Sequence, residues 1–275
     1  MSAVDAPAAA PQQSRAFFVD APGGCGKTYL FNLLLSTVRA RGEVALGAAT
    51  SGIAALLLAG GRTAHSLFKI PFIDLTEQST CSIGAHTAAA ELLRRAKIIV
   101  WNEITMSHKL AIEAVNRLLQ DIMKCVHPDL EFVPFGGKVV VFGGDFRQTL
   151  PVVRRGSRSA VVAACLKWSS LWQDIRKLRL TINMRVARML AQGADAAEQQ
   201  QWSEHLLAVG EGRTTSPMRV AEHLCSASQE VSSLVRAVFG DLGTEEHRTP
   251  ENLTNRGILT PKNEDVDTIN HEGLQ

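Results

Sequence analysis

Short apolar runs along the first two thirds of the chain follow the pattern of strands buried on both faces. They lie at Ala16–Asp20, Val44–Ala49, 97–101 and 138–143, with a weaker candidate at 176–180. A strand with one solvated face alternates between apolar and polar residues, whereas these runs are almost continuously apolar. The pattern therefore predicts the strands of a parallel sheet that is covered on both sides.

Helical spacing of apolar residues separates these runs. One such segment extends from Lys27 to about Ala40, and a second covers residues 107–124, where Leu110, Ala114, Leu118 and Ile122 share one face. Strands that alternate with helices predict an α/β fold with a parallel sheet and helices on both faces. In such sheets ligands bind beyond the carboxyl ends of the strands.

The pattern changes after about residue 180. Residues 192–201 are rich in Ala and Gln, residues 210–217 resemble a loop, and residues 257–260 predict one more strand before a helix from Asp265 onward. One strand and a few helices do not close a domain. We therefore expect a loose tail at 1–15, one domain at 16–180, and a linker with the start of an incomplete second domain at 181–275.

Composition excludes several classes of protein. Hydrophobic residues make up 45% of the chain and charged residues 20%, as in folded globular proteins. The net charge of +2 gives no overall field toward nucleic acid or membrane, so any such contact must come from local clusters. The five cysteines form no CxxC pair, which argues against zinc and disulfides and fits a reducing intracellular compartment. No apolar run reaches the roughly 18 residues of a membrane span, so no membrane partner is expected.

The segment Ala21-Pro-Gly-Gly-Cys-Gly-Lys-Thr28 joins the first strand to the first helix, as a P-loop does, with Ala in place of the first glycine. Glycines are needed because backbone N–H groups must face phosphate oxygens without side chains in the way. We expect Lys27 to reach the β- and γ-phosphates of a nucleoside triphosphate and the Thr28 hydroxyl to bind Mg²⁺. The loop itself comprises Gly23, Gly24, Cys25 and Gly26. A glycine-rich turn without a ligand is the alternative.

Two further strand ends carry polar side chains. Glu103 follows the run at 97–101 and is placed to polarise water, whereas Asn102 stands where an Asp is expected beside the metal. An amide keeps the shape but removes one negative charge, so we expect weaker Mg²⁺ binding and slower hydrolysis. A solvated glutamate at a strand end is the alternative for Glu103. After the run at 138–143, Gln148 is placed to sense the γ-phosphate, with Asp145 and Arg147 able to pair beside it.

Six blocks of the sequence, in this order, resemble the Pif-type DNA helicases, especially the version carried by Helitron transposons. They are DAPGGCGKTYL, ATSGIAALLLAGGRTAHSLFKIP, IIVWNEITMSHKLAIEAVNRLLQDI, PFGGKVVVFGGDFRQTLPVV, LTINMR and ILTPKNEDVDTIN. The resemblance covers nearly all of residues 16–275. It implies a RecA-like ATP-binding domain followed by an incomplete second RecA-like domain.

The resemblance also implies roles for residues. Lys27, Thr28, Glu103 and Gln148 are similar to the family's ATP-site residues, and Arg185 resembles an arginine that approaches the γ-phosphate from the second domain. The family's single-strand-binding segments correspond to Thr50, Ser51, Gly52, Thr63, His65 and Ser66. A structural histidine is the alternative for His65. We expect Leu56, Leu57 and Leu58, together with Trp168, Trp172 and Trp202, to pack in the interior.

The function implied is an ATP-dependent 5′→3′ DNA helicase that acts on single-stranded or tailed duplex DNA, with a further domain or partner completing the second lobe. Asn102 and the absence of the downstream motifs favour a second possibility, a module that binds ATP and DNA without turnover. A P-loop NTPase acting on protein or small molecules is a third. The family also implies roles in DNA repair, recombination and telomere maintenance, with a nuclear or mitochondrial location.

Overall fold

The computed structural model describes residues 15–72, 75–191, 197–214, 230–240, 242, 244, 247–260 and 262–272. Of the tail expected at 1–15, only Arg15 is described, so this expectation lies almost wholly outside the described residues. By contacts, the chain forms two compact units, Met1–Arg213 and Thr214–Gln275.

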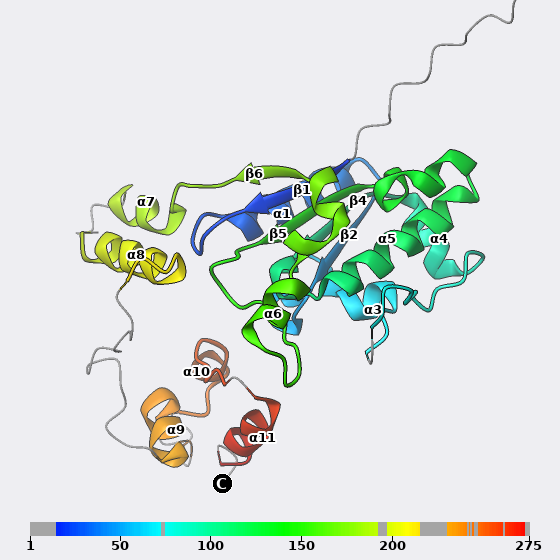
Figure 1. The fold of residues 1–275 in the computed structure, drawn as a ribbon. Coiled ribbons are helices and arrows are strands. Elements are labelled where there is room, and N and C mark those ends of the chain that lie inside the picture. Colours follow the sequence, from blue (N-terminus) through cyan, green and yellow to red (C-terminus); the bar gives the residue numbers. More distant parts are fainter. Residues whose placement is uncertain are drawn as a thin grey trace, which may run out of the picture. The chain divides into compact units, whose positions relative to one another are not determined.

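A six-stranded sheet forms the centre of the first unit (Figure 1). Its strands are β1 (Ala16–Asp20), β2 (Val44–Ala49), β3 (Arg62–Thr63), β4 (Ala96–Asn102), β5 (Val139–Gly144) and β6 (Arg176–Arg179). Their order across the sheet is β3-β2-β4-β5-β1-β6, and each neighbouring pair is parallel. The parallel sheet predicted from the apolar runs is therefore confirmed. The carboxyl ends of β1, β4 and β5 lie at one edge of this sheet.

Helices connect these strands along the first unit. They are α1 (Lys27–Ala40), α2 (Gly52–Leu56), α3 (Ala64–Phe68), α4 (Ala88–Arg95), α5 (Lys109–Lys124), α6 (Arg158–Ala164), α7 (Met184–Ala191) and α8 (Ala197–Gly210). Short 3₁₀ helices are η1 (Ile104–Met106), η2 (Pro128–Phe132), η3 (Pro134–Gly137), η4 (Leu166–Trp168) and η5 (Ser170–Asp174).

Alternate residues of the central strands face two separate apolar clusters. In β4, Ile99 and Trp101 belong to the cluster that contains the buried face of α5, whereas Ile98 and Val100 belong to the cluster that contains Phe31 of α1. Because successive side chains of a strand point to opposite faces, the two clusters lie on opposite sides of the sheet. This explains why the strand runs are apolar at every position.

The first helix and the first two strands begin and end where the sequence predicts, and β4, β5 and β6 differ by one residue at their ends. The two-residue strand β3 was missed because it is too short to produce a pattern. The strand predicted at 257–260 is wrong, since this stretch has no ladder partner among the described residues. Its apolar residues suggested a strand, but Leu259 is 87% exposed.

The described part of the second unit contains α9 (Val231–Phe239), α10 (Pro250–Thr254) and α11 (Asn263–Glu272). Helices α9 and α11 pack against each other, and Val235 of α9 is buried. The described residues at 181–191 and 197–213, which the sequence grouped with the second domain, fall within the first unit by contacts. One bond that holds them there joins the Met184 amide to the Gly24 carbonyl.

Two expectations about the interior are wrong in part. Leu58 is buried, but Leu56 and Leu57 are 86% and 57% exposed because α2 covers the sheet with only one face. The Trp172 ring packs against Phe18, whereas Trp168 is 64% exposed at the end of η4. An apolar residue in or next to a short helix is therefore not necessarily buried.

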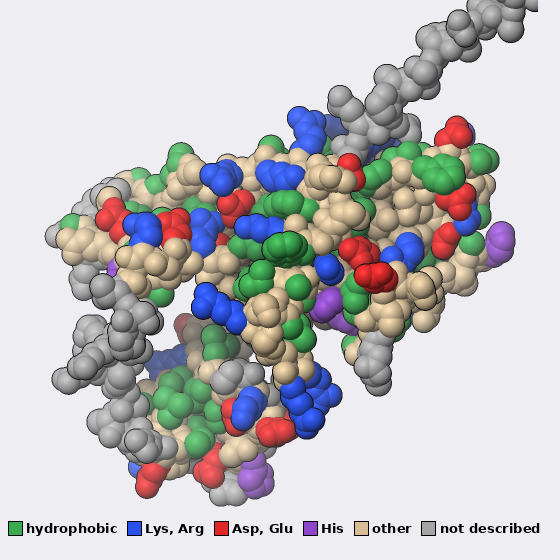
Figure 2. Space-filling view, in the orientation of Figure 1, with side chains coloured by type: hydrophobic (Ala, Val, Ile, Leu, Met, Phe, Trp, Pro, Cys, Tyr) green, Lys and Arg blue, Asp and Glu red, His purple; other side chains and the backbone are tan. Residues whose placement is uncertain are grey.

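Charges of both signs are interspersed on the face of the first unit shown in Figure 2, in keeping with a net charge of only +2. Among the described residues, none of the helices has both the length and the apolar character needed to cross a membrane.

Candidate functional site

The loop between β1 and α1 has the backbone of an anion-binding turn. Gly24 and Gly26 have φ angles of 87° and 81°, in the left-handed region that favours glycine. No side chain caps the N-terminus of α1, which begins directly at Lys27. The amides of the first helical turn have no partner within the helix, so they and the positive end of the helix face the loop. The turn therefore has two backbone features that the predicted P-loop requires.

Lys27 is buried in front of this loop and faces the end of β4. Its Nζ lies 3.3 Å from Oε1 of Glu103, and the two side chains are 10% and 21% exposed. Gly143 makes room for this arrangement, because a Cβ there would lie 2.3 Å from the Phe31 ring and 3.2 Å from Lys27 Cδ. The ammonium is thus held between the loop and a carboxylate, where a phosphate oxygen can replace one of its partners.

Asn102 lies beside this pair and is only 1% exposed. Its Oδ1 atom is buried and has no hydrogen-bond partner among the residues that the structure describes. A buried acceptor without a donor costs free energy, so such an atom marks a place where a donor is expected. A water molecule carried by a metal ion is one such donor. The neutral amide thus offers an unpaired acceptor directly before Glu103, but Asn102 is not among the residues that line the pocket around Lys27.

The end of β5 is connected to the P-loop strand through an arginine. Arg147 donates from Nε to Asp145 at 2.5 Å and from Nη2 to Asp20, the last residue of β1, at 3.0 Å. Burial opposes its charge, but the hydrogen bond to Asp145 and the charges of three carboxylates, Asp145, Asp20 and Glu211, raise the pKa of Arg147 above its usual value. Gln148 Nε2 donates to the other oxygen of Asp145 at 3.2 Å. The expected Asp145–Arg147 pair is confirmed, and it holds Gln148 at the site.

A single pocket of about 790 Å³ brings these residues together. Its lining includes Gly23, Gly24, Gly26, Lys27, Thr28, Glu103, Gln148 and Arg185. Arg185 enters from α7, which lies beside the P-loop (Figure 1). Arg188, one helical turn further along, lines the same pocket and was missed because the sequence offered no motif for it. Cys25 is buried behind the loop, and this burial raises the pKa of its thiol.

The segments predicted to bind single-stranded DNA lie past the ends of β2 and β3. The hydroxyls of Ser51 and Thr63 cap α2 and α3, and the Thr50 hydroxyl accepts a hydrogen bond from Trp101 Nε1 at 3.1 Å. These hydroxyls therefore have structural partners already. Gly52 and Ser66 are exposed.

His65 is half-buried, and burial lowers its pKa, which favours the neutral ring. This ring stacks on Phe72 with 4.9 Å between the centroids and 14° between the planes. Phe72 is 85% exposed and was missed from the sequence. The structure therefore places the exposed ring of Phe72 beside the segment at 63–66 that was predicted to bind single-stranded DNA.

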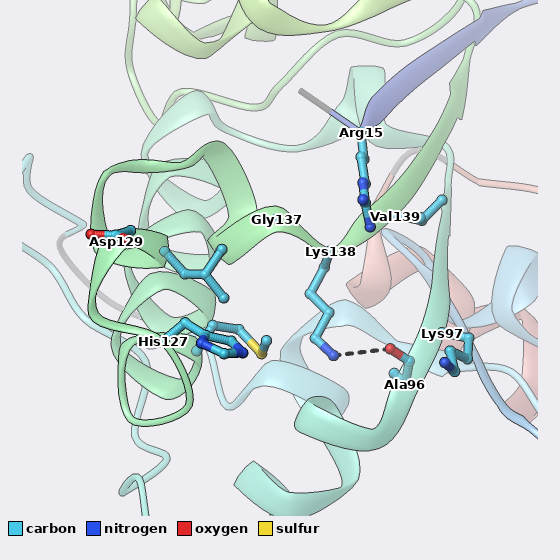
Figure 3. A pocket seen from close by; sticks show the side chains of 11 residues that line it. Arg15, Ala96, Lys97, His127, Asp129, Gly137, Lys138 and Val139 are labelled. Carbon is cyan, nitrogen blue, oxygen red and sulfur yellow. Dashed lines mark hydrogen bonds between the residues drawn. The ribbon is translucent and has the colours of Figure 1, made fainter. Parts of the chain in front are cut away.

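A second pocket, of about 460 Å³, lies at the opposite, amino edge of the sheet (Figure 3). Arg15, Lys97 and Lys138 lie along one side of it, and His127 and Asp129 lie along the other. Lys138 donates to the carbonyls of Arg94 and Ala96, the latter at 3.0 Å. Its charge therefore already has partners at the end of α4.

Comparison with known proteins gives one family. The family model described as PIF1-like helicase matches residues 3–219. The ATP-dependent DNA helicase Pif1 of Psychrobacter sp. is 32% identical over 158 residues, which are 57% of this chain and 23% of that protein. The ATP-dependent DNA helicase PIF4 of Trypanosoma brucei brucei is 29% identical over 137 residues, or 48% of this chain and 16% of that protein. The chain thus spans about a quarter or less of the length of these relatives.

Solved structures agree with this result. Pif1 from Bacteroides sp. in complex with ADP-AlF4 is 27% identical, with a TM-score of 0.51 over 64% of this chain and 40% of that chain. Bacteroides Pif1 in complex with ADP-AlF3 and single-stranded DNA covers 96% of this chain and 53% of that chain, with a TM-score of 0.62 at 21% identity. This last likeness concerns the fold, and it supports a RecA-like parallel sheet.

Proposed function

This chain belongs to the PIF1-like helicase family, and from this premise we propose that it is the nucleotide-binding motor portion of an ATP-dependent DNA helicase. One observation carries the proposal most directly. Lys27, Glu103, Gln148 and Arg185, which come from four separate segments, line one pocket in front of the uncapped N-terminus of α1. That arrangement suits a triphosphate whose terminal phosphoryl group is transferred to water.

Each residue has a role in this proposal. The P-loop amides and Lys27 bind the β- and γ-phosphates, and the Thr28 hydroxyl and Glu103 are placed to hold Mg²⁺ and its waters. Mg²⁺ supplies positive charge to the phosphate oxygens when it is bound. Glu103 orients the attacking water and Gln148 contacts the γ-phosphate. Arg185 stabilises the negative charge that develops on the phosphoryl group.

Single-stranded DNA, or the tail of a duplex, is the proposed partner. Residues 50–52 and 63–66 lie past the carboxyl ends of β2 and β3, at the same edge of the sheet as the nucleotide pocket. The Thr50 amide donates to the Asn102 carbonyl at 3.1 Å, so the two segments are directly bonded. A change in backbone position at the end of β4, beside the nucleotide site, can therefore be transmitted through this hydrogen bond to residues 50–52. The 5′→3′ direction of movement rests on the family alone.

A second candidate function is a module that binds ATP and DNA without turnover. The buried, neutral Asn102 favours it, because a carboxylate at this place adds a full negative charge next to Mg²⁺. Both candidates share nucleotide and DNA binding, and they differ only in hydrolysis.

Phosphate release from Mg·ATP, measured with and without single-stranded DNA, separates the candidates. Stimulation by DNA supports the helicase motor, binding of both ligands without release supports the silent module, and DNA-independent release contradicts both. The Asn102→Asp variant should raise release by roughly threefold to tenfold because it restores the missing charge. If the purified wild-type chain shows no affinity for Mg·ATP, the whole proposal is wrong.

A further inference from the structure

The start of α7 is bonded to the P-loop through its backbone. The amide of Met184, the first residue of the helix, donates to the carbonyl of Gly24 at 3.0 Å. Gly24 is also in close contact with Asn183, since a Cβ on Gly24 would lie only 2.6 Å from Asn183 Oδ1. Glycine is thus required at position 24 for two reasons: its φ of 87° is left-handed, and a side chain there would collide with Asn183.

Asn183 connects this contact to two helices. Its Oδ1 accepts from the amides of Arg185 and Val186, at 3.1 and 3.3 Å, as the cap of α7. Its Nδ2 donates to the hydroxyl of Ser203 in α8 at 2.7 Å. The three polar contacts of this side chain hold elements in place, and Asn183 lines an adjoining pocket together with Gln148 and Arg185.

The position of Arg185 depends on these bonds. Its amide is held by Asn183, and the preceding amide is held by the P-loop, so its backbone is anchored on the same loop that would carry the phosphates. Arg188 follows on the same helical face and lines the same pocket. A shift of the P-loop therefore moves the start of α7 and both arginines together.

We propose that Asn183 is a positioning residue, which couples the conformation of the P-loop to the placement of Arg185 against the γ-phosphate. The inference rests on the proposed ATP hydrolysis. In this arrangement, the Gly24 carbonyl and Asn183 hold the first turn of α7 against the P-loop, so that Arg185, which already lines the pocket, keeps its place against the γ-phosphate. A residue that only caps a helix would stabilise α7 without changing the catalytic step.

Kinetics of three variants test this inference. Asn183→Ala removes the cap and the contact to Ser203, Asn183→Ser keeps an acceptor for the helix amides, and Ser203→Ala is the matched control that leaves the cap intact. We expect Asn183→Ala to lower kcat by roughly 100-fold, as misplacement of a catalytic group does, with KM changed by less than about threefold. Asn183→Ser should recover most of kcat, and Ser203→Ala should change it little.

The double variant Asn183→Ala with Arg185→Ala gives the sharpest result. If Asn183 acts through Arg185, the double variant is no slower than Arg185→Ala alone, because the group to be positioned is already absent. Losses that multiply, or an unchanged kcat in Asn183→Ala, overturn the inference and leave the proposed function intact. If the wild-type chain releases no phosphate, the same comparison is made on the affinity for ADP with aluminium fluoride relative to ADP.

Hydrogen exchange provides a readout that does not depend on turnover. In the wild-type chain, Mg·ADP should slow exchange of the amides of Met184, Arg185 and Val186, and in Asn183→Ala it should not. Equal protection in both proteins contradicts the coupling. If the wild-type chain binds no nucleotide, both the proposed function and this inference are wrong. If it binds nucleotide normally but the exchange of these amides does not slow, only the inference is wrong.

Discussion

The two edges of the sheet each carry a pocket with a lysine that is at least half-buried, but only one has the features of a functional site. At the carboxyl edge, Lys27 lies 3.3 Å from Glu103 and faces the uncapped first turn of α1. At the amino edge, Lys138 lies among the basic residues Arg15 and Lys97 (Figure 3). Basic character alone does not distinguish the two pockets.

The difference lies in what the polar groups already contact. Lys138 donates to two backbone carbonyls at the end of α4, and helix ends leave such carbonyls without intrahelical partners. Its hydrogen-bond donors therefore already have partners within the fold. At the carboxyl edge the first turn of α1 has no side-chain cap, so its amides lack partners within the helix, and Lys27, Glu103 and Arg185 line the pocket in front of them. Unsatisfied groups that converge are a better guide to function than positive charge.

Removal of the lysine from each pocket should give the largest difference between the two edges, measured as the affinity for Mg·ATP. Lys27→Ala should weaken Mg·ATP binding by roughly 100-fold, because a charged hydrogen-bond donor to the phosphates is lost. Lys138→Met should leave binding unchanged within the error of a titration, since this side chain contacts only the other edge. Equal losses in the two variants would show that the pockets are not independent, and unchanged binding in Lys27→Ala would reject the P-loop assignment.

Glycine positions inside the nucleotide pocket sharpen the comparison at the level of the backbone. Gly24→Ala should weaken Mg·ATP binding by roughly tenfold, because a left-handed residue with a side chain is strained and its Cβ meets Asn183 Oδ1. Gly84→Ala is the control outside the pocket, since this glycine has no left-handed φ and its Cβ would make only an ordinary contact with Thr87 at 3.6 Å. Isothermal titration of both variants checks this. Equal affinities would show that the loop adopts another conformation with nucleotide.

The smallest effect concerns stability at the amino edge. Burial, followed by the charges of Lys97 and Arg94, lowers the pKa of Lys138 from 10.5 to about 8. Below pH 8 the charged side chain disfavours the folded state, and this penalty disappears as the pH rises toward 10.5, where the lysine is neutral in both states. Stability contributed by this group should therefore increase with pH across that window.

Urea midpoints of the wild-type chain and Lys138→Met, measured from pH 7 to pH 10, test this sign. The wild-type midpoint should rise relative to that of the variant as the pH increases. Other titrating groups are common to both proteins, so they cancel in the difference. Parallel curves would mean that the Lys138 ammonium titrates with its ordinary pKa.

Much of the nucleotide pocket could be predicted from the sequence because its parts are local. A glycine-rich turn, a lysine and a hydroxyl sit within eight residues of one another, and Glu103 follows an apolar run that can only be a buried strand. The rule that parallel strands present their carboxyl ends at one edge then brings Glu103 and Gln148 to the same loop.

Contacts that join distant segments could not be predicted in this way. The Arg147–Asp20 pair spans 127 positions of sequence, and the bond from Trp101 to Thr50 spans 51. Arg188 and Phe72 carry no motif, and their placement depends on how α7 and the loop after α3 pack. The errors at Leu56, Leu57 and 257–260 have the same origin, because burial depends on which neighbour covers a residue.

The amino-acid sequence alone determined the alternation of buried strands and helices and the chemistry of the phosphate loop, since both arise from residues close together in the chain. Tertiary structure alone decided which pocket has unsatisfied groups and how the arginine of α7 is tied to the P-loop. The physical reason is that hydrogen-bond satisfaction and burial belong to pairs of residues brought together by folding, and no single segment encodes them.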